Sequence, residues 1–336
     1  MSDCFSLQGF SVPAEIRGAL DRARRVLVMC HHNPDGDALG SSTALVRVLG
    51  NQGFESRLHL AGEWPKNLDF LLEGLSVDPD PQSSDYDLIF ILDCHGYDRL
   101  GPTGPELAEK LKDLPVVVID HHLLSEDEKS GALWIHQPQA SSTGELVWRV
   151  LTDLGWRPPQ EAVQGLLLAI VSDTGFYGQS NTTPDSLRAS ADLLELGGDL
   201  VEIKRRIMFD QPLRRLKLMG LTLDALTLHF EGRLATMIID PATLAKAGAE
   251  MVDAENFVEL GRGLAGVRMS VLIKDKGKGP GSIRVSLRSR DDVDARALAM
   301  LFGGGGHMQA AAYNDEQAEN AEEALNNLLA RAEPFL

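Results

Sequence analysis

The sequence predicts an α/β protein with a mostly parallel, doubly wound sheet in its first part and a smaller mixed α/β domain in its second. Three observations indicate this architecture. The chain has 336 residues, 43% of them hydrophobic, which is enough for two ordinary cores. In the first 200 residues, short β-branched runs alternate with amphipathic segments, as in strands connected by helices. From residue 226 on, paired strand-like runs separated by glycine turns replace that alternation.

The elements of the first domain follow from periodicity, proline and glycine. Buried strands are expected at four aliphatic runs: Arg25–Cys30, Arg57–Leu60, Leu88–Leu92 and Val116–Ile119. Helices are expected at five segments: Ala38–Leu49, Pro105–Leu111, Ser142–Leu154, Pro159–Val171 and Thr183–Leu196. The fourth helix opens after Pro158-Pro159, and Gly197-Gly198 stops the fifth, because proline suits a helix start and glycine a helix end.

We divide the chain into a first domain at residues 1–200, a helical connecting arm at 201–225 and a second domain at 226–336. The arm carries no strand pattern. Two hairpins are expected in the second domain, pairing Leu226–Phe230 with Leu234–Ile239 and Val267–Ile273 with Ser282–Leu287. A helix near Val293–Phe302, a glycine run and a terminal helix from Asp315 complete it.

Cysteine content and charge exclude several classes of protein. Three widely spaced cysteines without a CxxC pair argue against a disulfide framework or a zinc knuckle, and suit a reducing cytoplasm. No secretory signal pattern opens the chain, and no apolar run is long enough to span a membrane. The net charge of −17 disfavours a grip on long nucleic acid, because such affinity comes from basic surfaces. We therefore expect a cytoplasmic protein without membrane or long duplex DNA partners.

One segment departs from this acidity. Between Arg268 and Arg290, seven basic residues accompany a single acid, Asp275. Taken alone, this run is most simply a solvated strand pair with basic outer positions.

Polar side chains follow several elements of the first domain at the point where each ends. HHNPDGD (residues 31–37) follows the first strand, Asp93 the third and DHH (residues 120–122) the fourth, while SDTG (residues 172–175) follows an apolar helix. In open α/β sheets, ligands bind beyond the carboxyl ends of the strands. Four segments could therefore deliver Asp or His to one edge of the sheet.

Each segment alone has a plain structural explanation. Asp35 or Asp37 could cap the next helix, Asp173 could cap a turn, and a histidine at a strand end is usually a satisfied one. Together they are harder to explain, because clustered carboxylates repel each other and lose solvation unless cations join them. Carboxylate with imidazole, and no committed thiolate, favours manganese, magnesium or iron. Two such ions would activate a water and hold phosphoryl oxygens.

These motifs resemble, in order, the four motifs of the DHH phosphoesterase superfamily. The matching residues are HHNPDGDALGS at 31–41, Asp93 with Arg99 and Gly101, DHH at 120–122 and SDTG at 172–175. In the second domain, SIRVSLRS at 282–289, GGGGH at 303–307 and Ala310-Ala311 resemble the DHHA1 domain of that superfamily. The resemblance spans nearly the whole chain, and its spacing is closest to the bacterial oligoribonuclease (nanoRNase) and pAp phosphatase branch.

The resemblance implies a role for each motif residue. One divalent metal would lie on His31, Asp35 and Asp93, and a second on Asp37, Asp93, His121 and Asp173, with Asp93 bridging. Asp120 would orient the neighbouring histidine, and His122 would contact the scissile phosphate as a donor or proton shuttle. His32 fills a position that the family motif leaves variable, so we do not count it as a ligand.

The implied substrate contacts lie mostly in the DHHA1-like part: Arg99, Arg284, Arg288, Gly304, Gly305, Gly306 and His307. Glycine N–H groups can approach a phosphate because no side chain intervenes. The plain alternative is that the glycine run is a flexible turn between helices. The chain also departs from the family at Ala312, where glycine usually follows the two alanines, and this could alter the fit around a nucleotide.

The function implied is a metal-dependent phosphoesterase that hydrolyses short 5′-phosphorylated oligonucleotides, the bisphosphate pAp, or both. Its cofactors would be two divalent ions, manganese or alternatively magnesium. A manganese pyrophosphatase or exopolyphosphatase, a linear dinucleotide phosphodiesterase and a non-catalytic nucleotide sensor are the alternatives. A sensor is disfavoured because none of the six expected ligand positions is substituted. The sequence is compatible with a homodimer and leaves substrate length and cleavage direction open.

Overall fold

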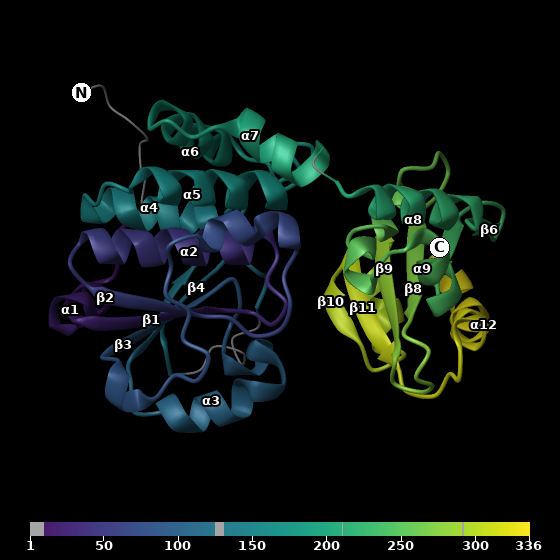
Figure 1. Ribbon diagram of the computed structural model, residues 1–336, viewed down its shortest axis with the longest axis horizontal. Coiled ribbons are helices and arrows are strands. Elements are labelled where there is room, and N and C mark those ends of the chain that lie inside the picture. The colour runs from purple at the N-terminus through teal and green to yellow at the C-terminus, as the bar shows by residue number, and fades with distance from the viewer. Residues whose placement is uncertain (1–9, 125–130, 210, 291) are drawn as a thin grey trace. The chain divides into compact units, whose positions relative to one another are not determined.

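The chain forms two compact units, Met1–Asp210 and Gln211–Leu336 (Figure 1). A computed structural model describes residues 10–124, 131–209, 211–290 and 292–336, apart from the side chain of His307. The boundary between the units falls within the segment 201–225, where the strand pattern of the sequence is interrupted.

The first unit contains one parallel sheet, whose five strands run in the order β2-β1-β3-β4-β5. The strands are β1 (Arg25–Cys30), β2 (Glu55–His59), β3 (Leu88–Leu92), β4 (Val116–Asp120) and β5 (Leu133–His136). The helices are α1 (Ala14–Arg22), α2 (Gly36–Asn51), α3 (Gly104–Leu111), α4 (Thr143–Leu154), α5 (Gln160–Asp173), α6 (Pro184–Glu195) and α7 (Leu200–Lys204). The strand order reverses between β1 and β3, which is where doubly wound sheets bind ligands.

Helices cover both faces of this sheet (Figure 1). Val26 and Val28 of β1 pack in one cluster with residues of α2, α4 and α5, whereas Leu27 and Met29 pack on the other face with residues of α3. Successive strand side chains point to opposite faces, so a strand buried on both sides reads as an unbroken apolar run. The five residues of β3 are accordingly all buried.

Glycines allow α2 and α5 to pack closely. A Cβ atom on Gly40 would lie 2.5 Å from the carbonyl oxygen of Gly165, and one on Gly36 would lie 2.5 Å from Oγ of Ser172. A larger residue at either position would push the helices apart. The start of α2 therefore lies beside the end of α5, and this brings the Asp35–Asp37 turn next to Asp173.

The second unit contains a mixed sheet with the strand order β10-β11-β9-β8-β7-β6. Its strands are β6 (Thr227–His229), β7 (Leu234–Ile239), β8 (Met269–Asp275), β9 (Ile283–Ser289), β10 (Gly305–His307) and β11 (Ala310–Asp315). Its helices are α8 (Leu213–Asp224), α9 (Pro241–Ala247), α10 (Val258–Arg262), α11 (Ala295–Met300) and α12 (Ala321–Ala332). Only β7 and β8 pair in parallel; the other neighbouring strands are antiparallel.

The two sheets confirm the predicted fold class. Several details differ from the prediction. Helix α1 and strand β5 were not anticipated, nor was the pairing of β10 with β11, which places Gly305 and Gly306 in the edge strand of the sheet. The terminal helix was wrongly expected to begin at Asp315, which instead ends β11. Asn320 caps α12, because its side chain accepts the N–H of Glu323.

Within the described ranges, no helix combines the length and apolar character needed to cross a lipid bilayer.

Candidate metal centre and substrate surface

Three groups of acidic and histidine side chains meet at the carboxyl edge of the first sheet. In each group, one ligand-type atom per residue lies within 4.8 Å of the others. The groups are His31, Asp35 and Asp93; Asp37, His121 and Asp173; and Asp93, His121 and His122. All six expected metal ligands are thus brought together, and Asp93 belongs to two of the groups.

The first group lies around His31, in the loop after β1. Its Nε2 atom is 3.6 Å from Oδ2 of Asp93 and 4.0 Å from Oδ1 of Asp35. Asp35 is 62% exposed, so this side of the centre is open to solvent. Asp35 also caps α2, because its Oδ1 accepts the N–H groups of Asp37 and Ala38. The side chain of Asp35 therefore caps α2 and also belongs to the first group of ligand-type side chains.

The second group lies around His121, just after β4. Its Nε2 atom is 3.5 Å from Oδ2 of Asp173, 3.6 Å from Oδ1 of Asp93 and 3.7 Å from Oδ2 of Asp37. Asp37 and Asp93 are almost fully buried. One imidazole nitrogen thus faces three carboxylates from three different segments of the chain.

Backbone carbonyls set the ring orientation of both histidines. Nδ1 of His31 lies 3.0 Å from the carbonyl oxygen of His32, and Nδ1 of His121 lies 3.3 Å from that of Ala140. Since a carbonyl only accepts, each Nδ1 carries a proton, and it is Nε2 of each ring that faces the carboxylates. Such carbonyl partners are typical of metal-binding histidines.

His122 has a different partner. Its Nδ1 lies 2.6 Å from Oδ1 of Asp120, which is completely buried and also accepts the backbone N–H of His122. Burial disfavours the charged ring, but the hydrogen bond with Asp120 and the nearby charges of Asp93 and Asp173 together outweigh it and raise the pKa of His122 to about 9. Asp120 therefore orients His122, while His121 is oriented by a carbonyl.

The electrostatics of the cluster are those of a site that favours cations. Burial, together with the nearby charge of Asp93, raises the pKa of both Asp37 and Asp173 well above the usual range. Burial also opposes the charge of Asp93, yet its contact with His31 and the nearby histidines lower its pKa to about 2. In turn the pKa of His31 rises to about 9, because contact with Asp93 and Asp35 outweighs desolvation. Without a cation, protons must neutralise this cluster of carboxylates. The residues present therefore fit a divalent metal centre.

Asp93 adopts an uncommon backbone conformation. Its φ angle is 60°, in the left-handed region, as is that of Asn33 at 55°. Aspartate and asparagine tolerate this region better than most residues, and such angles cluster at functional sites. The backbone of β3 therefore turns sharply at Asp93, and Cys94 packs into the core beneath the sheet as expected.

Sequence reasoning missed several hydrogen-bond donors to these carboxylates. Thr143 and Gly144, at the start of α4, donate to Asp37 and Asp93. The side chain of Asn181 donates to Oδ2 of Asp173 at 3.3 Å. Ser142 could be recognised as a helix start, but no spacing rule connects Thr143, the next residue, to Asp37 and Asp93, which lie 106 and 50 positions away.

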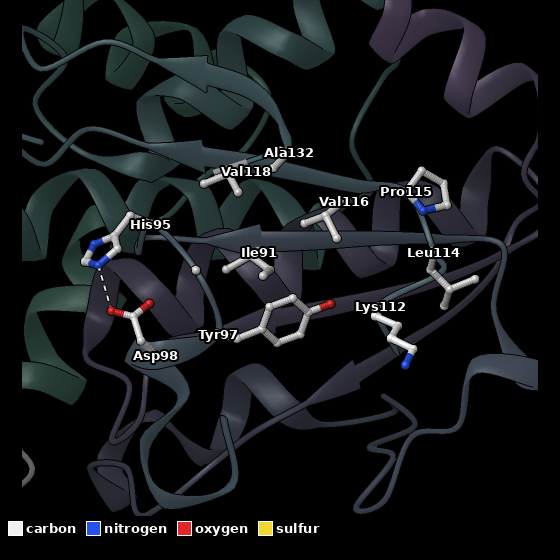
Figure 2. A pocket seen from close by; sticks show the side chains of 12 residues that line it. Ile91, His95, Tyr97, Asp98, Lys112, Leu114, Pro115, Val116, Val118 and Ala132 are labelled. Atoms are coloured by element: carbon white, nitrogen blue, oxygen red, sulfur yellow. Dashed lines mark hydrogen bonds and ion pairs between the residues drawn. The ribbon is translucent and has the colours of Figure 1, made fainter. Parts of the chain in front are cut away.

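Arg99 lies in the turn after β3 and is exposed. Its carbonyl accepts the N–H of His32 at 2.8 Å, which joins the turn to the loop after β1. A pocket of the first unit lies elsewhere, on the α3 face of the sheet (Figure 2). Ile91, Val116 and Tyr97 line it, and it contains none of the expected site residues.

In the second unit, the strand register places Arg284, Ser286 and Arg288 of β9 on the same face of the sheet. Ala310 and Ala312 of β11 pair with Arg288 and Ser286 and so lie on this face as well. Arg284 is exposed, and Arg288, 27% exposed, lies 3.2 Å from Glu259. Between the arginines, the surface consists of small side chains.

The glycines have separate structural reasons. A Cβ on Gly304 would lie 2.4 Å from the carbonyl oxygen of Ala312, and one on Gly306 equally close to that of Ala310. Both are therefore required by the approach of β10 to β11, which argues against the plain alternative of a flexible turn. Gly305 has nothing within 4 Å of its Cβ position and remains accessible. His307 ends β10, and its side chain lies outside the described part of the structure.

Comparison with known proteins agrees with this geometry. Residues 25–170 match the family model of the DHH family, N-terminal domain, and residues 234–333 match that of the DHHA1 domain. The chain is 31% identical over 323 residues to a bifunctional oligoribonuclease and PAP phosphatase NrnA of Thermus thermophilus, covering 91% of each protein. It is 24% identical over 185 residues to a probable manganese-dependent inorganic pyrophosphatase of Streptococcus mutans, covering 53% of this chain and 57% of that protein.

Among solved structures, the chain resembles an exopolyphosphatase-related protein from Bacteroides fragilis. The TM-score is 0.85 at 24% sequence identity, over 95% of this chain and 96% of that one. This likeness extends to the fold of both units.

Proposed function

The chain belongs to the DHH phosphoesterase family and is therefore a metal-dependent hydrolase, and from that premise we propose that it cleaves short 5′-phosphorylated oligonucleotides, the bisphosphate pAp, or both. One observation carries the proposal: acidic and histidine side chains from four separate segments converge at one edge of the sheet. The substrate class is that of the Thermus relative, whose name specifies an oligoribonuclease and PAP phosphatase.

In this proposal the centre would hold two divalent ions that share Asp93. His31 and Asp35 would complete one position, and Asp37, His121 and Asp173 the other. The ligand set supports manganese or magnesium, because hard carboxylate oxygens and borderline imidazoles outnumber any softer donor. When bound, such a pair supplies a water of lowered pKa and positive charge for the phosphoryl oxygens.

His122 is proposed to donate a hydrogen bond, and later a proton, to the substrate. Its raised pKa supports this role, because a ring with a pKa of about 9 is protonated at neutral pH. Asp120 holds Nδ1, so Nε2 is the nitrogen assigned to the phosphate or leaving group. The buried Asp120 thus positions the ring, and it stabilises the charge that the ring carries.

The second unit is proposed to bind the nucleotide part of the substrate, through a surface we call the small-residue shelf. It consists of Arg284, Ser286 and Arg288 with Ala310 and Ala312, on the shared sheet face. Arginine side chains suit phosphate and base edges, and small residues leave room for a flat base. Gly305 adds an accessible backbone, and Arg99 of the first unit is assigned to the phosphate.

The overall charge supports short substrates. A chain with a net charge of −17 repels a long polyanion, whereas a few phosphates need only a local basic surface. We therefore propose that long duplex DNA is not a substrate.

Timed hydrolysis tests the proposal. Labelled RNA and DNA oligonucleotides of about two to twenty residues, pAp, pyrophosphate, polyphosphate and long duplex DNA are incubated with manganese or magnesium. We expect the shortest oligonucleotides and pAp to be cleaved fastest, with no cleavage after chelation. Preferred turnover of pyrophosphate or polyphosphate would overturn the substrate assignment, and nucleotide binding without any metal-stimulated hydrolysis would favour a sensor.

A further inference from the structure

The start of α4 makes direct contact with two carboxylates of the metal centre. The N–H of Thr143 donates to Oδ2 of Asp37 at 2.7 Å, and the N–H of Gly144 donates to Oδ1 of the same residue at 2.9 Å. The hydroxyl of Thr143 donates to Oδ1 of Asp93 at 2.9 Å. Thr143 is completely buried, and Asp37 and Asp93 are 1% and 3% exposed. One residue thus connects a proposed ligand of one metal to the proposed bridging ligand of both.

The hydroxyl of Thr143 is a hydrogen-bond donor to one oxygen of the Asp93 carboxylate. The torsion that turns a carboxylate about its Cβ–Cγ bond is broad and has no sharp minimum of its own. In the structure, Oδ1 of Asp93 receives the Thr143 hydrogen bond and lies 3.6 Å from His121. The other oxygen, Oδ2, lies 3.6 Å from His31. Each oxygen therefore faces a different group of ligand side chains.

We infer that Thr143 is a positioning residue, which holds the carboxylate of Asp93 so that one oxygen serves each of two metal positions. This inference rests on the proposed function only for the presence of two ions. A Thr hydroxyl has a single proton to donate, and here that proton goes to Oδ1. One lone pair of Oδ1 is thereby occupied, and the same oxygen lies 3.6 Å from Nε2 of His121. Partners of this kind change metal affinity by roughly 10- to 100-fold when removed.

Side-chain and backbone contacts can be separated at this position. Substitution of Thr143 leaves both N–H donors to Asp37 in place, since they belong to the backbone of α4. Valine has nearly the shape of threonine but lacks the hydroxyl, so Thr143→Val removes only the contact with Asp93. Gly144 is unsuitable for the test, because a Cβ there would lie 2.4 Å from Cβ of Ala169.

The matched control is Thr43→Val. Thr43 is 1% exposed, lies in the same unit on α2, and donates its hydroxyl to the carbonyl oxygen of Leu39 at 2.8 Å. It reproduces the loss of one buried hydroxyl without touching a carboxylate.

The experiment measures the Mn²⁺ dissociation constant by equilibrium dialysis without substrate, and the melting temperature of the metal-free protein by circular dichroism. We expect Thr143→Val to weaken Mn²⁺ binding by roughly 10- to 100-fold. Thr143→Ser, which keeps the hydroxyl, should stay within about threefold of the parent, and Thr43→Val should match the parent in affinity. A purely structural role would lower the melting temperature of both valine variants and leave Mn²⁺ affinity unchanged.

Unchanged Mn²⁺ affinity in Thr143→Val would overturn the inference, as would equal weakening in Thr143→Ser. Should Thr143→Val fail to fold, Thr143→Ala and Thr143→Ser differ by one oxygen atom and decide the question. We then expect the serine variant to bind Mn²⁺ at least about tenfold more tightly, and equal affinities would contradict us. Because no substrate is present, a wrong substrate assignment leaves this result intact.

Discussion

The carboxyl edge of the first sheet and the small-residue shelf of the second are built in opposite ways. At the edge, buried Asp37 and Asp93 sit among histidines, and each acid has several donors fixed by helices or loops. On the shelf, Arg284 is exposed and alanines occupy the neighbouring strand positions. The edge concentrates buried charges that stabilise one another, whereas the shelf combines an exposed arginine with small side chains.

This difference indicates where single substitutions should reduce activity most. Removing one charge from the edge leaves the remaining groups uncompensated and displaces any bound cation. Removing one side chain from the shelf takes away a contact and leaves the surface otherwise intact. We therefore expect loss of chemistry at the edge and loss of affinity at the shelf.

The largest effect is expected for Asp93→Ala. A carboxylate shared by two metal positions supports both, so its loss should lower kcat at least about 1,000-fold, or about 4 kcal/mol of transition-state stabilisation. Turnover of pAp and of a phenyl phosphate ester measures this. Asp21→Ala, an exposed acid of α1, changes the net charge equally and should leave turnover unchanged. Substantial activity in Asp93→Ala on any substrate would place the chemistry elsewhere.

A smaller effect is expected from pH on metal affinity. In the metal-free protein the pKa of His31 is about 9, and that of Asp37 and Asp173 is raised. A cation must displace these protons, so Mn²⁺ binding should tighten by roughly tenfold per pH unit between pH 7 and 8.5. Calorimetry in buffers of different ionisation enthalpy would report the accompanying proton release. No release at pH 7.5 would contradict the linkage.

A rise in pH should tighten metal binding, but the same raised pKa values mean that it should lower the stability of the metal-free protein. His31 and His122 have folded-state pKa values near 9, above the unfolded value of about 6.5. Their contribution is complete below pH 6.5 and is lost as the pH rises through 9, so the free energy of unfolding should fall across that window. Added Mn²⁺ should reverse this trend.

The smallest effect is expected on the shelf. Arg288→Ala should raise KM for oligonucleotides or pAp by roughly tenfold, the value of one hydrogen bond to a charged group. KM for an artificial phenyl ester, which lacks a nucleoside, should change little. Arg331→Ala on α12, which packs over Phe302 in the cluster on the opposite face, is the control. Equal effects of Arg288→Ala on both substrates would refute the role of the shelf.

Much of the first unit could be predicted because its signals are local. Four strands and five helices follow from apolar runs, prolines and glycines, and the rule for ligand placement in parallel sheets pointed to residues 31–37, 93 and 120–122. Strand β5 was not predicted because its sequence, LWIH, is short and borders a polar segment. Helix α1 begins after Pro13 without a side-chain cap, so it gives no strong start signal.

The contacts that complete the site are not local, and no pattern within one segment encodes them. Thr143 contacts residues 50 and 106 positions away, which only the packed fold brings into reach. The close approach of β10 and β11 likewise gives Gly304 and Gly306 a structural purpose that the glycine run alone did not reveal. Motifs could suggest which side chains share an edge, but not which donors hold each carboxylate.

The central claim is that the edge of the first sheet holds two divalent cations on either side of Asp93. Anomalous scattering from crystals grown with Mn²⁺ tests it most directly. We predict two peaks about 3.5–4 Å apart, one next to His31 and one next to His121, with the Asp93 carboxylate in contact with both. A single peak, or peaks away from Asp93, would contradict the account.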